Sequence, residues 1–153
     1  MSLCCDVLKA LKGKKLATAE SCTGGGIGAA ITAVPGASKV YVGGVVSYTN
    51  AVKQKILGVE QAVLDKYGPV SAPVAGAMAS GVRELMEADV AVSVTGLAGP
   101  GGDEFGNPVG TVCIGYADKR QRLAKQYRFY GDRDEIREQA VRAALELILE
   151  VNA

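Results

Sequence analysis

The chain has 153 residues, the length of one ordinary domain, and we expect residues 1–153 to form a single domain. Its 17 lysines and arginines nearly balance its 16 aspartates and glutamates, and only 5% of its residues are aromatic, so the composition argues against a nucleic-acid partner. Because histidine is absent, a Ser-His-Asp triad and a metal site with histidine ligands are excluded.

Helices and strands alternate in the first half of the sequence, as the spacing of apolar residues and the positions of glycine and proline indicate. In chain order we expect a helix over residues 2–12, a strand over 15–20, a helix that opens within 21–26 and runs to about residue 34, a strand over 39–49, and helices over 50–57, 60–67 and 71–87. The pair Gly43-Gly44 in the second strand indicates a bulge or a crowded neighbour.

The second half is richer in strands. In chain order we expect a strand over residues 89–95, a glycine-rich loop over 96–109, strands over 111–117 and 122–129, and a helix that begins at Asp132. The first of these strands is almost entirely apolar, which is typical of a strand buried on both faces. The next two lie close enough in sequence to form a hairpin. Asp132 and Glu135 have the spacing of a capping box.

This order of elements predicts the fold class. Strands separated by helices imply crossover connections and a largely parallel sheet with helices on both faces, whereas the hairpin requires at least one antiparallel strand. We therefore expect an α/β protein, a three-layer α/β/α sandwich with a mixed, mostly parallel five-stranded sheet.

Two glycine-rich turns follow predicted strands, at residues 21–26 and 95–102. Ligands of open α/β sheets bind beyond the carboxyl ends of strands, and backbone N–H groups at a helix start bind anions, so both turns could contact one phosphorylated ligand. The alternative is that the glycines only permit sharp turns. Residues 24–29 match G-x-G-x-x-A, but no acidic residue follows before Glu60, so the ribose-binding part of a dinucleotide site is missing. The candidate ligand-binding residues here are Thr23, Gly24, Gly25, Thr95, Gly96 and Gly99.

Ser21 is a candidate nucleophile, because it lies between a strand end and a helix start. Without histidine it needs another base, and lysine is the usual alternative. Lys53 follows the end of the next predicted strand; if the two strands are neighbours, burial and the helix dipole would lower its pKa toward that of a usable base. Tyr48 could hydrogen-bond this lysine. The alternatives are that Ser21 is a helix N-cap, Lys53 a solvated lysine and Tyr48 a half-buried strand residue.

A cysteine beside Ser21 and two arginines in the last helix are further functional candidates. Cys22 is a rival nucleophile whose activation would rest on the helix dipole alone. Arg133 and Arg137, four residues apart at the start of the last helix, could bind phosphate, and we take Arg137 as the candidate ligand residue; the alternative is that they pair with nearby acidic residues.

The cysteines and the longest apolar runs bear on the cellular compartment. The four cysteines form no C-x-x-C pair, and no signal peptide precedes them, so we expect reduced thiols in the cytoplasm. No apolar run approaches the ~20 residues that a membrane-spanning helix needs, so we expect no membrane partner.

Several short segments carry a resemblance to a known family. They are A-E-S-C-T-G-G at 19–25, V-S-Y-T-N at 46–50 with Lys53, V-S at 70–71, T-G-L-A-G-P-G-G at 95–102, P-V-G-T-V at 108–112 and G-D-R at 131–133. In the same order and spacing, over about residues 5–150, the chain resembles the CinA C-terminal domain family, without the N-terminal domain of longer CinA proteins.

The resemblance implies a CinA-like, anticodon-binding-domain-like sandwich and a nicotinamide-nucleotide amidohydrolase. Such an enzyme converts nicotinamide mononucleotide to nicotinic acid mononucleotide and ammonia in pyridine nucleotide recycling. The resemblance implies Ser21, Lys53 and Tyr48 as the catalytic residues, N–H groups near residues 23–25 that stabilise the oxyanion, no cofactor and no metal. It also implies a homodimer or higher homo-oligomer. The alternative is a catalytically silent nucleotide-binding module linked to competence or DNA-damage responses.

Overall fold

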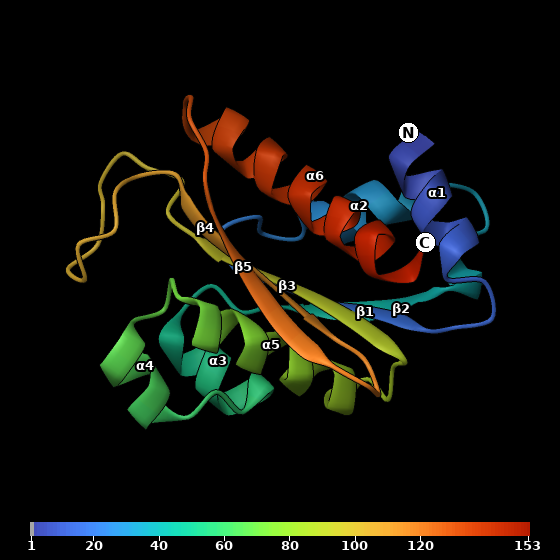
Figure 1. Ribbon diagram of the computed structural model, residues 1–153, viewed down its shortest axis with the longest axis horizontal. Helices are drawn as coiled ribbons and strands as arrows, with labels where there is room; N and C mark the ends of the chain where they lie inside the picture. The colour runs from blue at the N-terminus through green and yellow to red at the C-terminus, as the bar shows by residue number, and fades with distance from the viewer. Residues whose placement is uncertain (1) are drawn as a thin grey trace.

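Five strands form one mixed sheet in the computed structural model, which describes residues 2–153 (Figure 1). The strands are β1 (Leu16–Glu20), β2 (Tyr41–Val46), β3 (Val90–Gly96), β4 (Thr111–Ala117) and β5 (Arg122–Arg128). Their order in the sheet is β2-β1-β3-β4-β5. β1 is parallel to both β2 and β3, whereas β4 is antiparallel to β3 and β5. Only β4 therefore runs against the other four strands, and the expected mixed, mostly parallel sheet is confirmed.

Helices cover both faces of the sheet and complete three layers (Figure 1). The helices on one face are α1 (Ser2–Ala10), α2 (Gly26–Thr32) and α6 (Arg133–Asn152), and those on the other are α3 (Asn50–Leu57), α4 (Gln61–Tyr67) and α5 (Ala72–Leu85). A short 3-10 helix, Ala37–Lys39, precedes β2 and was not predicted. The three-layer α/β/α sandwich expected from the sequence is thus confirmed.

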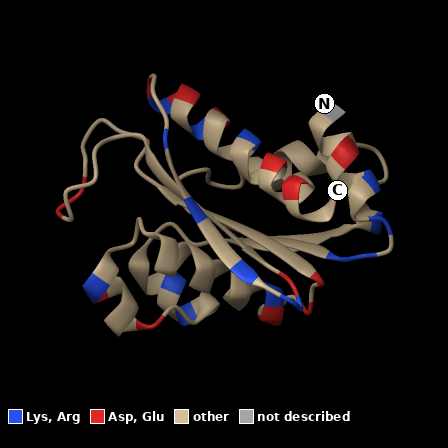
Figure 2. Ribbon diagram, in the orientation of Figure 1, with Lys and Arg blue, Asp and Glu red and all other residues tan. Residues whose placement is uncertain are grey.

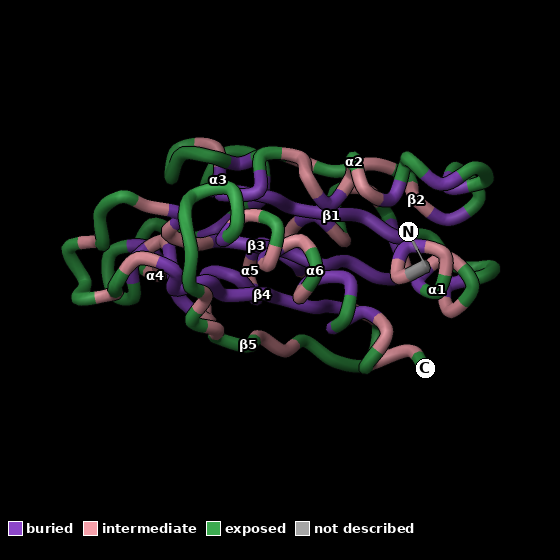
Figure 3. Tube along the Cα trace, turned by 90° about the horizontal axis from the view of Figure 1, so that it is seen from above, coloured by how far each residue is buried: buried purple, intermediate pink, exposed green. Residues whose placement is uncertain are grey.

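The hydrophobic core lies on both sides of the central strands. Every residue of β4 is buried, as is every residue of β3 except Gly96, which confirms the two-faced burial expected for residues 89–95. Figure 3 shows the same contrast, with β1, β3 and β4 buried and β2 and β5 more exposed at the edges. Fully buried side chains such as Leu16, Met78 and Ile148 each stabilise the fold by about 1.5–3 kcal/mol.

The two glycines of β2 lie at a bulge and beside a crowded neighbour, the two explanations that the sequence offered. The register between β1 and β2 shifts at Leu16 and Ala17, so the strand has a bulge next to Gly43. A Cβ atom on Gly44 would collide with the side chain and backbone of Thr18. The close approach of β1 and β2 therefore requires glycine at residue 44, and this pairing brings the ends of the two strands together.

Two element boundaries differ from expectation near these strand ends. α2 begins at Gly26, because Gly25 adopts a left-handed conformation with φ of 102°. Residues 21–25 therefore form a turn rather than the first turn of a helix. β2 ends at Val46, so Tyr48 follows the strand instead of belonging to it. Both shifts leave more irregular backbone around the strand ends than the sequence predicts.

The charged residues are interspersed over the surface. Figure 2 shows Lys and Arg mixed with Asp and Glu on the helices and connecting loops.

The Asp132–Glu135 capping box at the start of α6 is confirmed by hydrogen bonds in both directions. Among residues 2–153, no helix combines the length and apolar character needed to cross a lipid bilayer.

Candidate active site

Ser21 and Lys53 meet at the carboxyl end of β1. Ser21 directly follows this strand, and its N–H donates to Val94 O at 2.9 Å, which fixes the backbone at the strand end. Lys53 lies in the first turn of α3, whose start is capped by Thr49. Because β2 pairs with β1, the segment that leaves β2 brings Lys53 Nζ to 3.0 Å from Ser21 Oγ. The structure therefore places the two predicted residues in direct contact.

Lys53 is buried, with 1% of its surface exposed, so it is not the solvated lysine of the alternative interpretation. Its Nζ donates to Ser47 O at 2.8 Å and to Tyr48 O at 3.5 Å. No carboxylate lies within 4.0 Å of this nitrogen in the described part of the chain. Burial without a counter-ion disfavours the ammonium form and lowers the pKa of Lys53 to about 8. A substantial fraction of this amine is therefore neutral near physiological pH.

Ser21 is not a helix cap in this structure. The N-cap of α2 is Gly25, four residues later, and Ser21 Oγ instead accepts the hydrogen bond from Lys53. The neighbouring Cys22 is also buried, and this burial raises the pKa of its thiol to about 11. A thiol with that pKa stays protonated at neutral pH, so Ser21 is the stronger candidate nucleophile.

Glu20 holds the turn that carries Ser21, a role that sequence reasoning missed. The side chain is 2% exposed; its Oε1 accepts from Thr23 Oγ1 at 2.6 Å and from Ile27 N at 2.8 Å, and its Oε2 accepts from Gly28 N at 3.1 Å. The carboxylate thus caps the start of α2 from outside the helix and complements its positive end. A glutamate directly before a serine and a glycine-rich helix start is the sequence signal for this role.

Arg137 binds the outside of the same turn rather than lining the cavity beside Ser21. Its Nε donates to Cys22 O at 3.0 Å and its Nη2 to Thr23 O at 3.3 Å. The N–H of Gly24 already donates to Ser21 O. Among the described residues, the N–H groups of Cys22, Thr23 and Gly25 have no acceptor, so they are the donors of this turn that remain available to a developing oxyanion.

A cavity of about 270 Å³ opens beside Ser21. Its walls come from the first turn (Ser21, Cys22), the second glycine-rich loop and the segment that carries Lys53. Of the predicted ligand-binding residues, Thr95, Gly96 and Gly99 line this cavity, and Thr23, Gly24, Gly25 and Arg137 do not. The two glycine-rich turns therefore converge, but the first contributes through Ser21 and Cys22 rather than through its glycines.

Gly96 lets these two turns approach each other. A Cβ atom at this position would lie 2.7 Å from Val112 Cγ2 and 3.1 Å from Cys22 Sγ, which is closer than normal packing permits. Thr95 beside it is buried, and its hydroxyl donates to Pro69 O at 2.7 Å. This threonine therefore serves first to fix the loop.

Arg133 and Tyr48 form the rim of the cavity. Arg133 Nη2 lies 3.3 Å from Tyr48 Oη, and its Nη1 donates to Gly99 O. Tyr48 is 61% exposed, so it is not the half-buried strand tyrosine of the alternative interpretation. Lys53 contacts its backbone carbonyl and not its hydroxyl. The arginine that faces the cavity is thus Arg133 and not the predicted Arg137, a distinction that four-residue spacing alone cannot make.

The described residues contain no group of three or more Cys, Asp or Glu side chains placed to hold a metal ion. The polar groups that line the cavity include the hydroxyl of Ser21, the amine of Lys53 and the guanidinium of Arg133. Such a set can supply a nucleophile, a base and an anion-binding group.

Comparisons with known proteins place the chain in a family. The family model of the CinA C-terminal domain matches residues 2–152. A CinA-like protein of Synechococcus sp. is 54% identical over 107 residues, covering 70% of this chain and 26% of the relative. A putative competence-damage inducible protein of Caldanaerobacter subterraneus is 45% identical over 137 residues, covering 90% of this chain and 33% of the relative. The chain thus spans about a third or less of the length of these curated relatives.

Solved structures of the family share the whole fold. The crystal structure of the competence/damage inducible protein CihA from Agrobacterium tumefaciens superposes with a TM-score of 0.94 at 39% identity, covering 99% of this chain and 94% of that one. The match extends through the sheet and both helical layers, and the family model spans both glycine-rich turns. The chain therefore belongs to the CinA C-terminal domain family.

Proposed function

We propose that this chain is an amidohydrolase that converts nicotinamide mononucleotide to nicotinic acid mononucleotide and ammonia. The observation that carries the proposal is the buried Lys53 Nζ, with its lowered pKa, 3.0 Å from Ser21 Oγ at the wall of a cavity. The substrate is taken from the resemblance of A-E-S-C-T-G-G and the accompanying segments to the family's amidohydrolases. The competing function is a silent nucleotide-binding module, which would bind the same ligand without turnover.

The first half of the reaction would use neutral Lys53 as the general base. In the neutral amine the two N–H bonds would go to Ser47 O and Tyr48 O, so the contact with Ser21 would reverse and the Ser21 hydroxyl would donate to the Nζ lone pair. As Ser21 attacks the carboxamide carbon, its proton passes to Lys53 and the carbonyl oxygen gains negative charge. The free N–H groups of this turn, at Cys22, Thr23 and Gly25, would then stabilise this oxyanion.

The second half returns the proton and releases the acid. Protonated Lys53 gives its proton to the departing nitrogen, the C–N bond breaks, and ammonia leaves an acyl ester on Ser21. Water then attacks the ester with Lys53 again as base, and the carboxylic acid is released with Ser21 restored. These steps use the side chains of Ser21 and Lys53 and water, with Tyr48, which also lines the cavity, as the alternative proton donor to the departing nitrogen.

The anionic end of the substrate would lie near the rim. Arg133 is the charged group there, and its guanidinium is held by Gly99 O and Tyr48 Oη, so it is already oriented before a ligand binds. A guanidinium binds phosphate in a planar, bidentate manner. We therefore assign the 5′-phosphate to Arg133 and the carboxamide to the Ser21 end of the cavity.

The test is ammonia release from nicotinamide mononucleotide by purified protein in the presence of EDTA. We expect Ser21→Ala to reduce release by at least about 10³-fold, because it removes the nucleophile, while ligand binding measured by calorimetry persists. Ser38→Ala, an exposed serine in the 3-10 helix, is the matched control and should retain full activity. A folded wild-type protein that binds the nucleotide without releasing ammonia would contradict the amidase and favour the silent module.

A further inference from the structure

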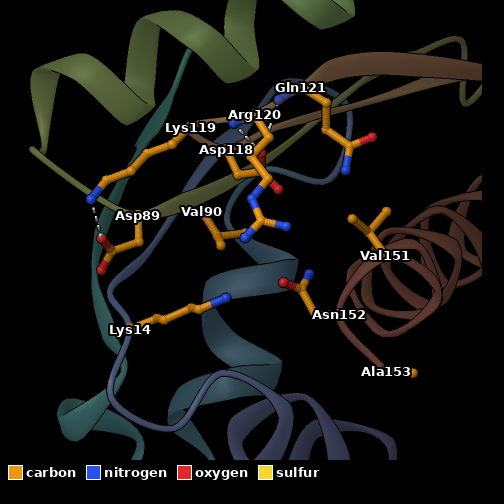
Figure 4. Close-up of a pocket in the computed structure, with 10 residues that line it drawn as sticks. All are labelled: Lys14, Asp89, Val90, Asp118, Lys119, Arg120, Gln121, Val151, Asn152 and Ala153. Carbon is orange, nitrogen blue, oxygen red and sulfur yellow. Dashed lines mark hydrogen bonds and ion pairs between the residues drawn. The ribbon is translucent and has the colours of Figure 1, made fainter.

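A second cavity, of about 430 Å³, lies at the end of the sheet opposite Ser21. It is bounded by the α1–β1 connection, the turn between β4 and β5 and the end of α6 (Figure 4). β1 begins beside it and ends at Ser21, and five residues at about 3.3 Å each separate the two sites by roughly 17 Å. This cavity is therefore distinct from the proposed active site.

The carboxylates around this second cavity are occupied by the backbone. Asp118 Oδ1 accepts from Arg120 N at 2.8 Å and from Gln121 N at 3.0 Å. Burial acts to raise the pKa of Asp118, but these hydrogen bonds, the hydrogen bond from Tyr116 and the nearby charge of Arg120 outweigh it and hold the pKa below its ordinary value. Asp89 Oδ2 accepts from Lys15 N at 2.8 Å, and its Oδ1 lies 4.0 Å from Lys119 Nζ. Both acids line the cavity, and each has at least one carboxylate oxygen occupied by backbone N–H groups.

Two of the basic side chains around the cavity, Lys14 and Arg120, form no close ion pair with another described residue. Lys14, from the α1–β1 connection, and Arg120, from the β4–β5 turn, extend into the cavity from different elements (Figure 4). Within residues 2–153, neither has a carboxylate oxygen within 4.0 Å of its charged nitrogens. Two converging cations in a concave site attract anions more strongly than the same charges on a flat surface.

The β4–β5 turn, which carries Arg120, is joined to the end of α6 through a buried tyrosine. Tyr116 is fully buried; its hydroxyl donates to Asp118 Oδ2 at 2.8 Å and accepts from Asn152 Nδ2 at 3.0 Å. This chain of hydrogen bonds ties the end of α6 to the β4–β5 turn. The cavity is therefore pre-formed, with the amides of Gln121 and Asn152 and the apolar side chain of Val90 on its surface.

We propose that this cavity binds a small organic polyanion, with one anionic group on Arg120 and a second on Lys14. The volume lies within the usual range for small-molecule sites, roughly 300–1,000 Å³. The planar guanidinium accepts a phosphate or a carboxylate in the same bidentate way, and the lysine serves as a point charge for either. The shared chemistry is therefore two anionic groups on one compact ligand.

The experiment uses pyrophosphate and citrate, which separate phosphate from carboxylate ligands, as probes in isothermal titration calorimetry at constant ionic strength. We expect saturable binding of at least one probe to the wild type. Lys14→Gln/Arg120→Gln should weaken it by at least about tenfold, because both charge-assisted contacts are lost. Lys55→Gln/Arg142→Gln, which removes two exposed charges elsewhere, is the matched control and should change the affinity less than about twofold.

Amide chemical shifts then locate the bound probe. Shifts at Gln121 and Asn152 support the second cavity, whereas shifts confined to Ser21 and Gly99 place the anion in the active site and overturn the proposal. Equal affinity in the wild type and the Lys14/Arg120 double variant, or no saturable binding of either probe, would also overturn it. Circular dichroism of the double variant confirms folding, which is expected because both side chains are exposed.

Discussion

The lowered pKa of Lys53 predicts a specific pH dependence of the proposed reaction. With a pKa of about 8, about 1% of the lysine is neutral at pH 6, about 10% at pH 7 and about half at pH 8. Because only the neutral amine can accept the proton of Ser21, kcat/KM should rise about 50-fold between pH 6 and pH 8 and reach a plateau above pH 9.

Two substitutions test whether Lys53 is the titrating group. Lys53→Arg keeps a positive charge that cannot be lost, and Lys53→Met keeps the length without an amine. Each should reduce kcat/KM by about 10²–10⁴-fold and remove the rise through pH 8. The assay is ammonia release at low substrate concentration, in a buffer of constant ionic strength from pH 6 to 9.5. A flat wild-type profile, or the same rise in the variants, would refute the assignment of Lys53 as the base.

Burial of Lys53 also makes the free energy of unfolding depend on pH. The pKa of Lys53 falls from 10.5 to about 8 on folding, so the unfolded chain binds more protons between these values and stability increases as the pH rises from 8 to 10.5. Below pH 8 the folded protein carries a penalty of about 3 kcal/mol, from about 1.4 kcal/mol per pH unit. Lys53→Met removes this penalty but leaves Ser47 O without its donor, which costs about 1–2 kcal/mol.

We therefore expect Lys53→Met to be more stable than the wild type by about 1–2 kcal/mol at pH 7, as measured by urea unfolding. The difference should shrink as the pH rises from 8 to 10.5 and should disappear or reverse above about pH 11.5, where the folded and unfolded lysine are both neutral. A variant that is less stable than the wild type at pH 7 would show that the ammonium is not penalised by burial, and would remove the basis for a neutral base.

The remaining predictions concern residues around the Ser21 turn and the rim. Glu20→Gln should lower stability by about 1–3 kcal/mol in urea unfolding and reduce kcat more than KM, because a neutral amide cannot accept all three hydrogen bonds of the buried carboxylate; an unchanged kcat would limit Glu20 to a structural role. Arg133→Gln should raise KM by about 10–100-fold with little change in kcat, whereas Arg137→Gln should lower kcat with little change in KM. If steady-state kinetics showed the KM effect in the Arg137 variant and the kcat effect in the Arg133 variant, the roles assigned to the two arginines would be exchanged.

The sequence predicted the fold and the Ser21–Lys53 contact for the same physical reason. Apolar periodicity identified the strands, and strands separated by helices had to run parallel, so their carboxyl ends met at one edge of the sheet. Ser21 and Lys53 each follow one of two adjacent parallel strands. Neighbouring strands lie about 4.8 Å apart, which is within the reach of a lysine side chain on the next element.

The choice between Arg133 and Arg137 required the tertiary structure. Residues four apart lie on one face of a helix, so either arginine fits a phosphate site by spacing alone. The docking of α6 places Arg133 at the cavity rim and Arg137 behind the Ser21 turn. The start of α2 was misplaced for a related reason, because the left-handed conformation of Gly25 delays the helix to Gly26 and exposes N–H groups that a continuous helix would have used.

The Glu20 side chain points away from Lys53, which explains how a site without histidine could keep a neutral lysine as its base near neutral pH. Glu20 and Ser21 are adjacent in sequence, and because successive side chains leave a strand on opposite faces, the carboxylate turns toward α2 while the hydroxyl turns toward α3. A carboxylate beside Lys53 would stabilise its ammonium form and raise its pKa. Instead the amine is surrounded by a hydroxyl and two carbonyls, so burial decides the balance. The alternating side-chain directions at the end of β1 thus separate Glu20, which shapes the turn, from Lys53, which would accept the proton.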